Sequence, residues 1–308
     1  MAAVPVVGPV DLAGSLDVFR RSGDDLLDRW DGRVWLRALA DGDRMVGLAA
    51  RPVGTVTDPG LLVEAEAGAD PAAAGRALAV AFPTAPEALA GLAAADPVIA
   101  RIADRFPGIV PVLQPDLLTA VVRAISAQQI TLRFAAVLRG RLARRYGHRH
   151  QVADAEVWSL DPGRLAGAEV ADLRELQFSN AKAVATVAFA GAVASGRMDL
   201  RELAALDDEA VVERLVAFPG IGRWTAEWLL ARTLGRPRVV AGDLGVRKAV
   251  GAAYLDGRMP SEAEVRAVTA HWGEAAGVAQ QLLLHWLSTE APTGPRSATR
   301  PGRSSRRG

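Results

Sequence analysis

The stretch Leu215-Val-Ala-Phe-Pro-Gly-Ile-Gly-Arg-Trp-Thr-Ala-Glu-Trp228 decides the fold of this chain. Pro219 ends the preceding helix, because its ring blocks helix continuation. Gly220 and Gly222 allow backbone conformations closed to other residues and leave no side chain between the backbone and a ligand. A second helix then begins at Arg223 with unpaired N–H groups and a positive dipole end. The stretch therefore predicts two helices joined by a turn that binds phosphate.

The Gly-x-Gly of this stretch differs from a dinucleotide-binding fingerprint. A helix precedes it rather than a strand, and Thr225 stands where the third glycine should be. A phosphate-binding Walker A loop is also excluded, because the only lysines, Lys182 and Lys248, do not follow a glycine. Ile221 is instead expected to pack between the two helices. The pattern argues against a dinucleotide-dependent enzyme of small molecules.

A second signal lies downstream, in residues 237–249, Pro-Arg-Val-Val-Ala-Gly-Asp-Leu-Gly-Val-Arg-Lys-Ala. Its aspartate, Asp243, precedes a helix, so an N-cap alone would explain it. A helical hairpin, a loop with Gly and Pro, and an aspartate about twenty residues later together resemble the helix-hairpin-helix DNA glycosylase superfamily. Three further segments and the sheet-bearing N-terminal region resemble the DNA-3-methyladenine glycosylase II family within it. These segments are Leu118–Ile130, Leu176–Ala183 and Leu282–Trp286, and the resemblance covers nearly all of residues 10–290.

The composition sets the broad class of protein. The chain has 308 residues, of which 50% are hydrophobic and 23% charged, and it has no cysteine. A disulfide framework, a thiolate zinc site, a cysteine-ligated iron–sulfur cluster and a cysteine nucleophile are therefore excluded. No apolar run approaches the ~18–20 residues of a membrane span, and the N-terminus lacks a signal-peptide pattern. We expect a cytoplasmic protein without membrane contact.

The charge is unevenly distributed. The net charge is +1, but residues 291–308 carry five arginines and no acid, so the remaining body carries −4. Binding to a polyanion must therefore come from local patches. This Pro-, Gly-, Ser- and Arg-rich tail cannot bury a core, and we expect it to be disordered.

The periodicity predicts an α+β protein in three parts: a small mixed α/β sheet domain (1–90), an all-helical core that carries the helical hairpin (91–290) and the basic tail (291–308). In the first part, β-compatible runs at 34–39 and 45–50 flank Asp41-Gly42, a hairpin signal. Further strands are expected at 53–56 and 61–65. Helices are expected at 70–82, 96–106, from Asp116, from Thr131, and at 180–193, 207–217, 223–234, 244–254, 261–272 and 276–288.

The resemblance implies hydrolysis of the N-glycosidic bond of alkylated purines, such as 3-methyladenine and 7-methylguanine, in duplex DNA. This reaction begins base excision repair. The chemistry of breaking this bond in a duplex requires particular groups in the active site. A carboxylate must stabilise positive charge on the sugar, and the base must be flipped into a pocket. Electron-rich aromatic faces hold a base made cationic by alkylation. Asp243 is the expected catalytic carboxylate, and duplex DNA with alkylated bases is the expected partner of a monomeric enzyme.

Tryptophans are the candidates for the pocket wall. Trp224 and Trp228 lie four apart, on one helix face. Trp224 matches the position where the family places a pocket-wall aromatic, whereas Trp228 is expected in the core. The family also places an aromatic in the C-terminal helix, and Trp286 is the candidate there, although its register is displaced by one residue.

The resemblance also assigns DNA contacts. The loop after the helix from Asp116 supplies the side chain that fills the gap left by the flipped base, and Gln129 matches that wedge position. Some relatives use an apolar residue there; a glutamine could hydrogen-bond to the orphaned base, or both glutamines could simply be solvated. Arg247 and Lys248 could contact phosphate or form a solvated helix face. The expected DNA-binding residues are Gln128, Gln129, Gly220, Ile221, Gly222, Arg223, Thr225, Arg247 and Lys248.

No cofactor is expected to be required. Hairpins of this kind often hold a monovalent cation, Na⁺ or K⁺, and correspondence with the family gives the backbone carbonyls of Val216, Phe218 and Ile221 as ligands. The histidines lack metal-ligand spacing, and His148 and His150 are expected in solvent.

Strand-nicking members of the superfamily use a lysine two residues after the second hairpin glycine, and Trp224 stands there. The sequence therefore predicts a monofunctional enzyme. Two alternatives remain: a glycosylase for another lesion, such as hypoxanthine or an oxidised purine, and a non-catalytic helix-hairpin-helix DNA-binding protein.

Overall fold

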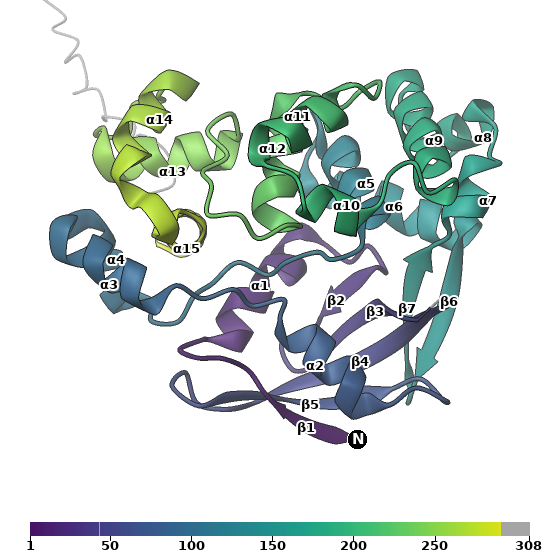
Figure 1. Ribbon diagram of the computed structural model, residues 1–308, viewed down its shortest axis with the longest axis horizontal. Helices are drawn as coiled ribbons and strands as arrows, with labels where there is room; N and C mark the ends of the chain where they lie inside the picture. Colours follow the sequence, from purple (N-terminus) through teal and green to yellow (C-terminus); the bar gives the residue numbers. More distant parts are fainter. Residues whose placement is uncertain (43, 291–308) are drawn as a thin grey trace, which may run out of the picture.

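The computed structural model describes residues 1–42 and 44–290, and it places a helical body over an N-terminal sheet (Figure 1). The sheet has the strand order β1-β5-β4-β3-β2, and all neighbouring strands are antiparallel. The strands are β1 (Ala2–Pro5), β2 (Asp28–Trp30), β3 (Trp35–Asp41), β4 (Arg44–Gly54) and β5 (Pro59–Ala65). Helix α1 (Leu12–Ser22) follows β1, and α2 (Pro71–Ala79) packs on β1 and β5.

The expected hairpin is confirmed as β3–β4, with its turn one residue later than predicted. Asp41 pairs with Arg44 and so still belongs to the strand. Gly42 has φ +63°, the left-handed conformation that such turns require. The strand expected at 45–50 and the first two residues of the one expected at 53–56 form the single strand β4, which ends at Gly54.

The helical body agrees with the predicted helix starts. Asp96, Asp116 and Thr131 each accept a hydrogen bond from a backbone amide of the helix they cap. The spacing of Leu132, Leu138 and Leu142 predicts that all three face inward; this is wrong for Leu132, which is the first residue of its helix and is 56% exposed. The helices are α3 (Pro86–Ala95), α4 (Pro97–Arg105), α5 (Leu117–Ala127), α6 (Leu132–Tyr146), α7 (Pro162–Ala166), α8 (Val170–Glu175), α9 (Asn180–Ala194), α10 (Leu200–Ala204), α11 (Asp208–Val216), α12 (Arg223–Arg232), α13 (Leu244–Tyr254), α14 (Glu262–Thr269), the 3₁₀ helix η1 (Ala270–Ala275) and α15 (Ala276–Thr289).

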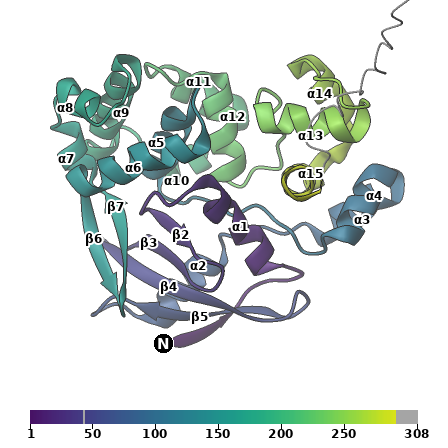
Figure 2. The same cartoon turned by 180° about the vertical axis from the view of Figure 1, so that it is seen from behind.

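One β-hairpin interrupts the region expected to be all-helical. Strands β6 (Gly147–Val152) and β7 (Ala155–Leu160) run beside the sheet, as seen from behind in Figure 2. His150 is buried there, with Nδ1 2.8 Å from Glu66 Oε2 and Nε2 2.9 Å from the Ser159 hydroxyl. The prediction of a solvated His150 is therefore wrong, because the strand turns this residue toward β4 and β5, whereas His148 is exposed as expected.

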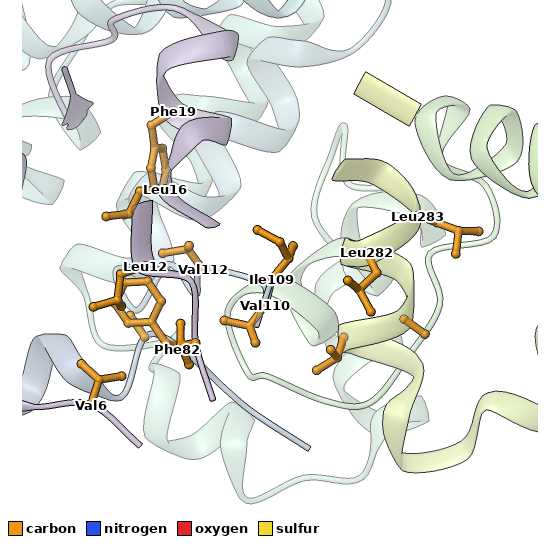
Figure 3. Packing of buried hydrophobic residues seen from close by; sticks show 14 of the residues in the cluster. Val6, Leu12, Leu16, Phe19, Phe82, Ile109, Val110, Val112, Leu282 and Leu283 are labelled. Carbon is orange, nitrogen blue, oxygen red and sulfur yellow. The ribbon is translucent and has the colours of Figure 1, made fainter. Parts of the chain in front are cut away.

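The described residues form two large hydrophobic cores and one small cluster, and the largest core joins the N-terminal sheet to α15. It combines the sheet and α1 with residues of α13 and α15. Figure 3 shows Leu12 and Phe19 of α1, Ile109 and Val110 of the connection between α4 and α5, and Leu282 of α15 in this core. The second core is built from α5, α6 and α8–α12. The helical hairpin thus belongs to the second core, whereas Asp243 begins a helix of the first.

Buried ion pairs tie the N-terminal segment to α5 and α6. Asp25 is 1% exposed, and its Oδ2 lies 2.9 Å from Arg123 Nη2 and 2.8 Å from Arg139 Nε. Burial by itself would raise the pKa of Asp25, but Arg123 and Arg139 hold it below its ordinary value. Arg123 also pairs with Asp28 at 3.1 Å. This network fixes the helix that leads to Gln128.

Among the residues described, no helix is both long and apolar enough to cross a membrane. The expected disordered tail, residues 291–308, lies outside the described residues.

Candidate active site and nucleic-acid interface

The helical hairpin forms as predicted between α11 and α12. The Phe218 amide donates to the Leu215 carbonyl at 3.1 Å, and the Ile221 amide donates to the Phe218 carbonyl at 3.2 Å. Gly220 has φ +75°, and a Cβ there would lie 2.7 Å from the Cβ of Ala185 on α9. Ile221 is 4% exposed and packs in the second core. Gly220 is therefore required by the fold, and Ile221 can offer DNA only its backbone.

The N-terminus of α12 is open. Gly222 is its N-cap and supplies no capping side chain. Gly222 is exposed, and a Cβ placed on it would meet no described atom within 4 Å. The amides of the first helical turn therefore face the surface without a side chain in front of them. This arrangement suits a phosphate group, which the amides and the helix dipole both attract.

We expect Gly222→Ala to weaken binding to every duplex by a similar factor, of several-fold, because the hairpin contacts phosphate and reads no sequence. Fluorescence anisotropy on lesion and undamaged duplexes measures this effect. The melting temperature should change by less than about 2 °C, since Gly222 has open space around it. Gly220→Ala is the contrasting variant and should lose stability as well, through its left-handed φ. A Gly222→Ala variant with altered lesion preference and unchanged overall affinity would contradict the phosphate role.

Asp243 is the N-cap of α13, and one of its oxygens remains available. Oδ1 accepts a hydrogen bond from the Val246 amide at 3.0 Å. Its loop is anchored to α15, because the Val240 amide donates to the buried Gln280 side chain at 2.7 Å. Within the described part of the chain, Oδ2 accepts no hydrogen bond, and the residue is half-buried. The carboxylate therefore caps a helix and can still face a reacting sugar.

Helix α12 presents one accessible stripe. Trp224, Trp228 and Arg232, spaced four residues apart, are half-buried, whereas the residues between them are buried. Trp228 packs against the second core, as expected, and Trp224 belongs to none of the hydrophobic clusters. Burial lowers the pKa of Arg232 to about 10, and the negative charge of Asp243 acts in the opposite direction. Arg232 was missed at the sequence level, although its spacing from the tryptophans is visible there.

The structure corrects two expected side-chain contacts on α12. Thr225 is 1% exposed, because its position on the helix faces the core, so only its backbone amide remains a candidate for DNA. The Arg223 side chain is half-exposed and forms ion pairs with Glu209 at 2.9 Å and with buried Glu227 at 3.1 Å. A phosphate would have to compete with both carboxylates for Arg223.

Trp286 is placed apart from the other pocket candidates. It lines an open pocket with Ile102 and Arg105 of α4. Leu284 of α15 lies next to α13 instead: a Cβ placed on Gly245 would be 3.3 Å from Leu284 Cδ2. Two residues along a helix turn the side chain by roughly 200°. Trp286 therefore lies on a different face of α15 from Leu284, which meets α13.

The loop after α5 separates its two glutamines. Gln128 is the C-cap of α5, and its Nε2 donates to the Gly220 carbonyl at 3.2 Å. Gln129 is exposed and has φ +60°. A left-handed residue other than glycine stores strain that the surroundings must hold. An exposed side chain on a strained backbone at a loop tip is compatible with the wedge role of Gln129, which stays a prediction.

The two basic residues after Asp243 differ in their contacts. Arg247 Nε donates to the Pro260 carbonyl at 2.8 Å, so this side chain is tied to the protein. Lys248 is exposed. It remains the better candidate for a phosphate contact.

The described residues contain no group of three or more acidic or histidine side chains that could hold a metal ion. The expected cation ligands are backbone carbonyls instead. The Phe218 carbonyl accepts the Ile221 amide, while those of Val216 and Ile221 accept none of the turn or loop hydrogen bonds described. Two of the three carbonyls are therefore available to a monovalent cation, and the cation itself stays a prediction.

Comparisons with known proteins agree with this geometry. The family described as the HhH-GPD superfamily of base excision DNA repair proteins matches residues 122–274. A putative DNA-3-methyladenine glycosylase of Bacillus subtilis is 29% identical over 62% of this chain and 66% of its own length. DNA-3-methyladenine glycosylase 2 of Escherichia coli is 34% identical over 43% of this chain and 45% of its own. The matches thus span less than two thirds of these relatives.

Solved structures extend the similarity to the whole described fold. The 3-methyladenine DNA-glycosylase from Archaeoglobus fulgidus superposes with a TM-score of 0.82 at 26% identity, covering 94% of this chain and 99% of that one. A Clostridium acetobutylicum 8-oxoguanine glycosylase/lyase in complex with DNA has a TM-score of 0.70 at 15% identity, covering 91% and 92%, and shows a shared fold alone. With its hairpin, its downstream aspartate and these matches, the chain belongs to the HhH-GPD superfamily of base excision DNA repair proteins.

Proposed function

We propose that this protein is a monofunctional DNA glycosylase that hydrolyses the N-glycosidic bond of alkylated purines in duplex DNA. The observation that carries this proposal is Asp243. Its half-buried carboxylate is held through Oδ1, while Oδ2 is available, and its charge acts on the accessible stripe of α12. A protein that only bound DNA could use this carboxylate as the cap of α13, but it would gain nothing from the available Oδ2 next to a polyanion.

The residues divide the work of binding and chemistry. The hairpin amides and the N-terminus of α12 hold a DNA phosphate, and Gln129 enters the duplex at the site of the flipped base. Trp224 offers its ring face to a base made cationic by alkylation. Asp243 stabilises the positive charge that develops on the sugar as the bond from C1′ to the base nitrogen breaks. The electron pair of that bond goes to the alkylated base, which leaves as a neutral molecule. The oxygen of a water molecule then bonds to C1′, and the proton that this water loses goes to solvent.

Hydrolysis, rather than attack by an amine, follows from the positions of the lysines. Trp224 stands two residues after Gly222, where strand-nicking relatives carry their lysine. Lys182 Nζ donates to two backbone carbonyls, and Lys248 is exposed on α13. We propose that the enzyme acts as a monomer and leaves an abasic site.

Arg232 favours a second candidate, a glycosylase for a neutral base such as hypoxanthine. A guanidinium on the same accessible stripe as Trp224 would repel a cationic base and could donate hydrogen bonds to an exocyclic oxygen. The same catalytic carboxylate would serve both substrates, so the two candidates differ only in the base.

Release of free bases tests the proposal. We expect methylated genomic DNA incubated with the protein to release 3-methyladenine and 7-methylguanine, identified by mass spectrometry. Release of hypoxanthine from deaminated DNA, without alkylated bases, would favour the second candidate. If neither DNA releases a base above a protein-free control, both candidates are wrong.

A further inference from the structure

Lys182 lies where the C-terminal end of α5, the first turn of α9 and the helical hairpin meet. It is in the first turn of α9, and its Nζ donates to the carbonyl of Ser126 at 2.9 Å and to that of Gln128 at 2.6 Å. These carbonyls belong to the C-terminal end of α5, where backbone oxygens have no partner within the helix. A positive charge there is also favoured by the helix dipole. Lys182 therefore caps α5 from outside the helix.

The same contacts connect the loop to the helical hairpin. Gln128 Nε2 donates to the Gly220 carbonyl at 3.2 Å. Gly220 packs against α9, one turn after Lys182, where a Cβ would approach Ala185 to 2.7 Å. The loop end is thus held on one side by α9 and on the other by the hairpin. Gln129 follows these two anchors directly, exposed and with φ +60°.

The surroundings of Lys182 show that its ammonium group is committed to this contact. The side chain is half-buried, and burial lowers its pKa. Hydrogen bonds from a charged donor are stronger than those from a neutral one. A partly buried ammonium group has lost part of its hydration, so it depends more on these two carbonyls. Both hydrogen bonds would have to break before Nζ could act as a nucleophile or contact a phosphate.

We propose that Lys182 is a positioning residue that holds the Gln128–Gln129 loop in its strained form, and so sets how efficiently a base is removed from a duplex. The inference rests on the proposed glycosylase function. The expected consequence is specific. Loss of the clamp should harm reaction on a duplex, where the loop must fill the gap left by the base, and spare reaction on a single strand, which has no gap.

The test compares two substrates with one lesion. Single-turnover base release is measured on a duplex and on the same strand alone, for wild type, Lys182→Met and Lys182→Arg. We expect Lys182→Met to lower the duplex rate by about tenfold and the single-strand rate by less than about twofold. Lys182→Arg, which keeps a charged donor, should recover most of the duplex rate. Arg201→Met removes one exposed charge from α10, beyond the far end of α9, and should leave both rates unchanged.

A second readout separates positioning from phosphate contact. The salt dependence of DNA binding should be the same for Lys182→Met and wild type, because the ammonium contacts carbonyls and not phosphate. Equal losses of rate on duplex and single strand, or a salt slope reduced by about one ion, would overturn the proposal.

Hydrogen exchange tests the clamp without any reaction. Amides of residues 127–131 should exchange faster in Lys182→Met than in wild type or Arg201→Met, at unchanged global stability. Unchanged exchange in this segment would overturn the inference even if the protein releases bases. Failure of the wild type to release any base would instead reject the glycosylase function and leave the clamp to be judged by exchange. If Lys182→Met does not fold, Gln128→Ala removes the hairpin anchor and should shift exchange and rate ratio in the same direction.

Discussion

Asp243→Asn is expected to abolish base release, with a loss of about 10³-fold or more in single-turnover rate. Affinity for lesion DNA should stay within about tenfold, because the carboxylate serves the charged transition state rather than the bound substrate. Asparagine keeps a side-chain oxygen that can accept the Val246 amide, so the cap of α13 and the fold should persist. Single-turnover kinetics and anisotropy on one alkylated duplex measure the two effects.

A matched control separates chemistry from capping. Asp70 is the exposed N-cap of α2 and accepts the Ala72 amide at 2.9 Å. Asp70→Asn makes the same chemical change at a cap remote from the hairpin and should leave base release unaltered. Turnover by Asp243→Asn close to that of wild type would show that Asp243 is an N-cap alone.

Asp25→Asn is expected to give the largest loss of stability. The change leaves Arg139 buried without its carboxylate partner, and it leaves Arg123 with Asp28 alone. Breaking a buried ion pair in this way costs about 3–5 kcal/mol, which corresponds to a fall in melting temperature on the order of 10 °C. Asp24→Asn, in the same segment, removes an exposed ion pair with Arg29 and should cost less than about 1 kcal/mol.

The pH dependence of stability gives an independent check on Asp25. Its pKa is lower in the folded protein, so its contribution is complete above the ordinary aspartate pKa of about 4. The contribution is lost as the pH falls through the lower, folded value. Denaturant unfolding between neutral and acidic pH should therefore lose more stability in wild type than in Asp25→Asn. Parallel pH profiles for the two proteins would contradict the ion-pair assignment.

Local signals in the sequence were sufficient for the helix starts and the helical hairpin. An N-cap such as Asp116 or Ser261 acts within three residues of itself, so its effect can be read from a short segment. The same holds for Gly220, whose left-handed φ is a local property of the turn. The cap of α13 at Asp243 was predicted in the same way and is confirmed, whereas the catalytic role of Asp243 stays a prediction.

Contacts between distant segments were beyond such reasoning. Hairpin β6–β7 was missed because its strands are short and gain their burial from β3 and β4, about one hundred residues earlier. His150 was placed in solvent for the same reason, since its partner Glu66 lies in another domain of the sequence. At the sequence level Lys182 was excluded from a Walker A loop and was given no structural role, because nothing local shows that its ammonium reaches the end of α5.

The most direct test of the central claim, a hydrolytic glycosylase without lyase activity, uses an end-labelled duplex with a single alkylated or hypoxanthine base. We predict that the labelled strand stays intact while the base is released, and that it breaks only on later treatment with alkali. Borohydride added during the reaction should trap no covalent complex, because Trp224, and neither lysine, stands two residues after Gly222. Strand cleavage without alkali, or a borohydride-trapped complex that disappears in Lys248→Ala, would contradict the account.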